Sequence, residues 1–145
     1  MKNPKPILTA AVAAAAQLLG WKGVLLVCWV CAMLLDYLSG SLAAKLSGTW
    51  SSRIAREGVA HKAGMLLVVL TAALTDLALA AARTQLDLGL PWPAMLLPLV
   101  VTWYTLTEFG SILENAAQMG APIPAWLTNG LKKTTAALNT QAEKE

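Results

Sequence analysis

Three apolar blocks dominate this sequence, and each is close to the length of helix that crosses a lipid bilayer. They cover residues 23–44, 63–82 and 93–117. The hydrocarbon core of a bilayer is crossed by about 20 residues of helix. Over the whole chain 57% of the residues are hydrophobic and only 13% are charged, against about 25% charged residues in soluble domains. The chain is therefore predicted to be an all-α membrane protein with three long transmembrane helices.

A fourth apolar stretch, residues 7–20, is short for a transmembrane helix. The lysines before it, Lys2 and Lys5, are also typical of a signal peptide. Gln17 to Leu19 make a poor cleavage site, so we expect this short N-terminal helix to be retained.

Cationic residues indicate the orientation, because Lys and Arg in short loops stay on the cytoplasmic side. Those predicted to be cytoplasmic are Lys45, Arg53, Arg56, Lys62, Lys132 and Lys133. Four crossings also place Lys2 and Lys5 inside, whereas three crossings leave them outside. The charges favour four segments, with three as the alternative. Both place the loop between Lys45 and Lys62 and the C-terminus in the cytoplasm.

The C-terminal part divides from the membrane domain near two prolines, Pro122 and Pro124, which cannot continue a helix interior. We expect a transmembrane domain over residues 1–122 and a cytoplasmic part over residues 123–145. A helical face is predicted from the spacing of Ile123, Leu127, Leu131, Thr134 and Leu138. This pattern favours a short amphipathic helix on the inner leaflet, beside anionic lipid headgroups. A frayed tail is the alternative.

Each long block contains one acid: Asp36, Asp76 or Glu108. A charged Asp at the centre of a transmembrane helix costs about 2.5–3.5 kcal/mol on insertion scales. Ionisable residues inside such helices are therefore rare and usually mark a functional path or a partner.

Small and polar residues share the helical face of two of these acids, which favours close helix packing. The candidate pore or oligomerisation residues are Asp36, Ser39, Gly40, Asp76, Tyr104, Glu108, Ser111 and Asn115. Two interpretations remain open. The polar faces either lock a helix bundle by hydrogen bonds, or they control assembly and line an aqueous path.

Several function classes have no support in the sequence. The single histidine, His61, rules out a Ser/His/Asp triad and a histidine-rich metal site. Cys28 and Cys31 have a redox spacing but lie inside an apolar block, where buried thiols are the simpler interpretation. We predict no enzyme activity, no catalytic residue, no cofactor and no metal, and the net charge of +3 requires no nucleic acid.

An ordered set of short motifs resembles the phage holin family that also includes the clostridial toxin-secretion holins. The motifs are "DYLSG" (36–40), "SS" (51–52), "GVAHK" (58–62), "EFGSILENA" (108–116) and "GAPIP" (120–124). Outside the acid-bearing faces, the family-matching positions are Ser51, Ser52, Gly58, Lys62, Glu114, Gly120, Pro122 and Pro124.

The resemblance implies a multi-pass protein of the bacterial inner membrane that accumulates in lipid and then oligomerises into lesions. Such lesions release an endolysin for host lysis, without direct contact being implied, or release large proteins in toxin secretion. An antiholin is a possible partner. Two rivals remain: a small proton or cation channel or transporter subunit, and an antiholin or membrane anchor in a complex.

Overall fold

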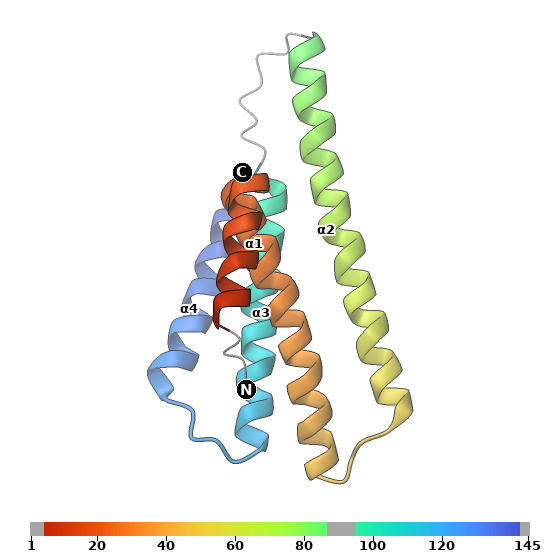
Figure 1. Cartoon of the computed structure of the whole chain (residues 1–145), viewed down its shortest axis with the longest axis vertical. Helices are drawn as coiled ribbons and strands as arrows, with labels where there is room; N and C mark the ends of the chain where they lie inside the picture. The colour runs from red at the N-terminus through yellow and green to blue at the C-terminus, as the bar shows by residue number, and fades with distance from the viewer. Residues whose placement is uncertain (1–4, 87–94, 143–145) are drawn as a thin grey trace.

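The structure is a computed structural model of the chain, and it describes residues 5–86 and 95–142. Within these residues the chain forms four helices (Figure 1). They are α1 (Lys5–Leu46), α2 (Ser52–Leu86), α3 (Leu96–Gln118) and α4 (Ala125–Ala142). By length and composition, three segments can cross a membrane: Gly20–Leu46, Ser52–Leu86 and Leu96–Gln118. The predicted all-α architecture with three long apolar helices is confirmed. Residues 93–94 of the third predicted segment, Lys2 and residues 143–145 of the tail lie outside the described residues.

The helix α1 is interrupted at Gly20, where the backbone has φ 63° and ψ −157°. This conformation is essentially restricted to glycine. The chain turns back there, so residues 5–19 form a short helix that runs opposite to the rest of α1 (Figure 1). The predicted segment at 7–20 is therefore helical and set off from the first long one. Whether it crosses the membrane stays a prediction.

The helix α2 begins earlier than expected, because most of the predicted loop from Lys45 to Lys62 is helical. Only residues 47–51 link α1 to α2. The Ser51 hydroxyl accepts a hydrogen bond from the backbone N–H of Ile54 at 3.2 Å, which caps the start of α2. One turn later Arg53 and Glu57 form an ion pair at 2.9 Å. This correction matters for the site, since it carries Lys62 three turns into a rigid helix.

The core lies where α3 packs against both α1 and α2. Its buried apolar side chains are Trp29, Met33, Met65, Val69 and Val101. Tyr104 stacks on Trp29 with the ring centroids 6.3 Å apart. Because α1 and α2 touch each other little, α3 is the helix that holds the other two together.

The helix α4 runs antiparallel along α3 (Figure 1). The indole N–H of Trp103 donates to the Asn139 side-chain oxygen at 2.9 Å. The side facing α3 carries Thr128, Leu131 and Thr135. Leu127, predicted to share this side, is exposed. Ile123, Leu131 and Leu138 of the predicted face do lie toward α3. The predicted position on the inner leaflet stays a prediction.

Asp76 fixes the start of α3. Its two carboxylate oxygens accept the backbone N–H groups of Leu96 at 3.2 Å and Leu97 at 3.0 Å. The first N–H groups of a helix have no partner within it, and the next residue, Pro98, has no N–H. No side chain of the helix's own N-cap residue, Met95, makes this bond. Asp76, which is 6% exposed, therefore acts as a helix cap supplied by α2.

We predict that Asp76→Ala lowers the free energy of unfolding by about 2 kcal/mol, because two backbone donors of α3 lose a charged acceptor. Asp76→Asn keeps one acceptor oxygen and should lose about half as much. Denaturant titration in detergent micelles, followed by circular dichroism, measures both losses. Thr75→Ala is the control, since the Thr75 hydroxyl bonds only within α2, to the Thr71 carbonyl. Equal stability of Asp76→Ala and Thr75→Ala would contradict the capping role.

Candidate functional site

Two of the three intramembrane acids meet at one lysine. The Lys62 ammonium lies 2.9 Å from Oδ2 of Asp36 and 2.6 Å from Oε2 of Glu108. Asp36 comes from α1, Lys62 from α2 and Glu108 from α3. Their side chains are 20%, 17% and 5% exposed, respectively. This group, called the triad below, joins all three long helices at one level.

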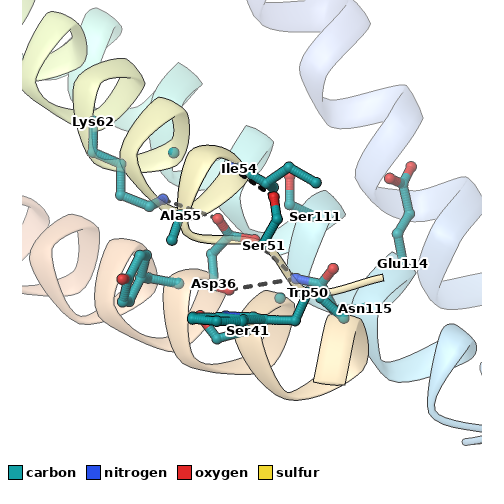
Figure 2. Close-up of a pocket in the computed structure, with 14 residues that line it drawn as sticks. Asp36, Ser41, Trp50, Ser51, Ile54, Ala55, Lys62, Ser111, Glu114 and Asn115 are labelled. Carbon is teal, nitrogen blue, oxygen red and sulfur yellow. Dashed lines mark hydrogen bonds and ion pairs between the residues drawn. The ribbon is translucent and has the colours of Figure 1, made fainter. Parts of the chain in front are cut away.

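Asn115 completes the junction between α1 and α3. Its side-chain N–H₂ donates to Oδ1 of Asp36 at 3.1 Å and to the Ser39 hydroxyl at 3.0 Å. Figure 2 shows Asp36 between Lys62 on one side and Asn115 on the other. Both carboxylate oxygens of Asp36 are therefore partnered, as a carboxylate away from water requires.

Gly40 is what lets α1 come so close to Asn115. A Cβ atom at position 40 would lie 3.3 Å from the Asn115 side-chain nitrogen, which is tighter than ordinary van der Waals contact. Small residues at helix contacts allow this kind of approach in membranes. Ser39, Gly40 and Asn115 were all predicted site residues, and the structure brings them together.

The triad has a net charge of −1 when its three groups are ionised. Separately, each charged group would be costly in lipid. Together, two carboxylates share one ammonium in a medium where charge interactions are weakly screened. Removal of one partner from such a buried pair is far more destabilising than replacement of all partners by neutral groups. The stability of the packed helices should therefore depend on all three side chains together.

A cleft of about 370 Å³ lies beside the triad, between α1, α2 and α3 (Figure 2). Many of the motif positions singled out in the sequence line it: Asp36, Gly40, Ser51, Gly58, Lys62, Ser111, Glu114 and Asn115. Ser111 also donates to the Thr107 carbonyl within α3, at 3.3 Å. The motifs therefore converge in space, although they come from three helices.

Other predicted residues lie outside this site. Asp76 caps the opposite end of α3, and Tyr104 belongs to the aromatic core. Gly120 ends α3 with φ 87°, and the N–H of Ala121 bonds the Ala116 carbonyl there. The remaining predicted positions are Ser52, the first residue of α2, and Pro122 and Pro124, in the link before α4.

The predicted cytoplasmic cations divide into two groups. Lys62 is part of the triad, whereas the sequence predicted it as a loop cation and as a family-matching position, without a partner. The others are at the surface: Lys45, Arg53, Arg56, Lys132 and Lys133. Lys45 lies over the Trp50 ring, 5.8 Å from its centroid. A signal for Lys62 was present, since it directly precedes an apolar block and lies three residues before the buried Met65.

No group of three or more metal-ligating side chains occurs in the part of the chain that the structure describes. Cys28 and Cys31 are free thiols. The triad has neither a nucleophile with its base nor a free acid–base pair, so its evident chemistry is electrostatic attachment of helices.

The profile of the bacteriophage holin family matches residues 13–136. An uncharacterized protein of Halalkalibacterium halodurans is 32% identical over 125 residues, which cover 85% of this chain and 88% of that protein. An uncharacterized protein of Listeria monocytogenes is 35% identical over 100 residues, covering 69% of this chain and 64% of that protein. An uncharacterized 14.9 kDa protein of Clostridium perfringens is 36% identical over 99 residues, covering 68% and 67%. No solved structure matches the chain.

We predict that Lys62→Met lowers the free energy of unfolding by about 3–5 kcal/mol, because the buried Glu108 and the partly buried Asp36 lose their counter-ion. The triple variant Asp36→Asn, Lys62→Met, Glu108→Gln should recover most of that loss. Unfolding in detergent micelles measures both. Arg56→Met, at an exposed position on the same helix, should change stability by about 0.5 kcal/mol or less. A triple variant as unstable as Lys62→Met would show that charge pairing within the triad is not what stabilises the packed helices.

Proposed function

The chain belongs to the bacteriophage holin family, and we propose that it acts as a holin. In this proposal it accumulates in the bacterial inner membrane and then oligomerises into lesions. An endolysin, or another large cytoplasmic protein in the case of toxin secretion, leaves through them. The functional partner is then an endolysin that the chain need not touch, and an antiholin is a possible regulator.

The triad is the observation that carries this proposal. It pairs Asp36 of α1, Lys62 of α2 and Glu108 of α3 within one chain, so a single copy can reside in lipid with these three groups partnered. That property fits a protein that accumulates harmlessly. The same groups are polar enough to face water if the helices separate, which fits a later lesion.

The membrane potential offers a trigger of the right size. Moving one elementary charge through 100 mV is worth about 2.3 kcal/mol. A triad with a net charge of −1 couples to this field if its helices shift relative to the bilayer. Loss of the potential then shifts the equilibrium from the dispersed state to the assembled lesion, provided that the two states differ by a few kcal/mol in free energy.

The proposed topology places the basic residues on either side of the α1–α2 link, Lys45, Arg53 and Arg56, in the cytoplasm. Four crossings, with residues 7–20 as the first, put both termini inside. The membrane domain then covers residues 1–122, and residues 123–145 form a cytoplasmic part.

The triad also favours one second candidate, a small proton or cation conductor, because buried carboxylates beside a lysine are typical of ion pathways. A third candidate function is that of an antiholin or a membrane anchor in a complex. Passage of folded protein separates a holin from both.

We predict that induced expression of this chain alone in a bacterium causes a delay, then abrupt death with escape of a folded cytoplasmic reporter enzyme. Glu108→Gln should shorten the delay, because Lys62 then holds α3 by a weaker, uncharged acceptor. Viability, membrane potential and reporter activity outside the inner membrane are followed together. Glu57→Gln removes an exposed carboxylate of α2 and should keep the wild-type delay.

Two outcomes would contradict the holin proposal. Depolarisation without reporter escape would identify an ion conductor, and no effect on the cells would favour an antiholin or anchor. If the delay were unchanged in Glu108→Gln while the reporter still escaped, the triad would have no part in timing.

A further inference from the structure

Glu114 differs from the other carboxylates that the structure describes, because its charge has no partner. Within residues 5–86 and 95–142 the others all bind a cation or a backbone N–H: Asp36, Glu57, Asp76 and Glu108. Glu114 is exposed and forms no ion pair with any described residue. It stands at the edge of the cleft beside the triad, apart from Lys62 (Figure 2). Because the triad itself has a net charge of −1, this edge of each copy is negatively charged.

The opposite charge lies on the outer side of α2. The side of α2 that lines the cleft includes Ala55, Gly58 and Lys62. At 3.6 residues per turn, Arg56 is about 140° round the helix from that side. Arg56 is exposed and forms no ion pair with another described residue. Each copy therefore presents an unpaired anion on one side and an unpaired cation on another.

Arg56 and Glu114 also lie at the same level. Lys62 and Glu108 are in direct contact at 2.6 Å, so they mark one level shared by α2 and α3. Arg56 comes six residues before Lys62, and Glu114 comes six residues after Glu108. Since α2 and α3 run antiparallel (Figure 1), both steps lead toward the same end of the bundle. Each step is about 9 Å of helix.

Two other cations near this end are less suited to Glu114. Lys45 lies over the Trp50 ring. Lys132 of α4 lines the space on the other side of Glu114 but forms no ion pair with it. Leu131 lies against Gly110, which is four residues from Glu114, so Lys132 is about 7 Å from the level of Glu114. Arg53 on the outer side of α2 is already paired with Glu57.

We propose that Arg56 of one copy binds Glu114 of the next copy when copies assemble. The inference rests on the proposed function, because it assigns the contact by which the copies of a lesion meet. Copies that share one orientation in the membrane have these two residues at equal depth, so they meet without a shift along the membrane normal. A contact between two different patches is heterologous, and without such a shift it builds a ring rather than a helical filament.

The pair sets the geometry of assembly more than its strength. An exposed ion pair contributes little free energy. Charges across an interface fix the register of the partners and exclude wrong arrangements. The apolar sides of neighbouring copies then meet at a defined depth and in a defined order.

Cross-linking between copies tests the contact. Arg56→Cys and Glu114→Cys are combined in a full chain that also carries Cys28→Ser and Cys31→Ser. The protein is reconstituted in phospholipid vesicles and treated with a short bifunctional thiol reagent. We expect a ladder of covalent oligomers from this chain, because each copy has both halves of the contact. A mixture of the two single-cysteine chains should stop at the dimer.

Ala63→Cys in place of Arg56→Cys is the matched control. Ala63 is exposed on nearly the same side of α2 but lies about 10 Å farther along the helix. Its ladder should be several-fold weaker. An equal ladder from the control would overturn the proposed depth. The absence of a ladder from the test chain, or dimers from either single-cysteine chain alone, would overturn the head-to-tail contact.

An exchange of charge separates a contact between copies from one within a chain. Arg56→Glu and Glu114→Arg are made singly, and energy transfer between copies labelled at Cys28 in a Cys31→Ser chain reports assembly. Each variant alone should lose transfer several-fold, because like charges then meet. An equal mixture of the two variants should restore it, since every contact again joins opposite charges. Failure of the mixture would overturn the proposal, because mixing cannot restore a pair within one chain.

Lys132→Gln is the control for the cation of α4 and should leave the transfer unchanged. A loss as large as that of Arg56→Glu would assign Glu114 to Lys132 and overturn the proposed pair.

Escape of a folded protein trapped in the vesicles is recorded in the same samples. Escape without the ladder would reject the Arg56–Glu114 contact and leave the holin function standing. The ladder without escape would retain the contact and reject the holin function.

Discussion

The contact of one lysine with two carboxylates is the interaction on which the rest of the structure depends. Each of the long helices contributes one member of the triad. The neighbouring apolar core is small. Apolar side chains gain little from leaving lipid for a protein interior, so helix association in a membrane relies on packing and polar contacts. Lys62, Asp36 and Glu108 supply such contacts at the level where Gly40 lets α1 approach α3.

Two attachments at opposite ends explain why α3 is the central helix. At its start, Asp76 of α2 binds the first free backbone N–H groups of α3. Toward its other end, Glu108 and Asn115 bind Lys62 and Asp36. One end is fixed by a helix cap and the other by ion pairs. A change in charge at the triad therefore weakens the attachment toward the C-terminal end of α3 and leaves the cap at its start unchanged.

The sequence predicted the helical architecture because long apolar blocks leave few alternatives in a bilayer. It also singled out Asp36, Glu108 and Asn115, since polar residues inside such blocks are costly. It did not predict that Lys62 would be their partner, because apolar periodicity cannot show that a helix extends past its apolar part into charged residues. The cap at Asp76 was missed for a related reason. That contact joins two helices, and helix propensity describes only one at a time.

An exchange of charges between α1 and α2 tests the central claim most directly. Asp36→Lys and Lys62→Asp are made singly and together, and the free energy of unfolding is measured in detergent micelles for all four chains. Either single variant changes the ratio of one cation to two anions, whereas the double variant restores it. We expect the double variant to be more stable than either single one, with a favourable coupling of at least about 1 kcal/mol. A double variant whose loss equals the sum of the two single losses would show that the triad does not hold the helices together.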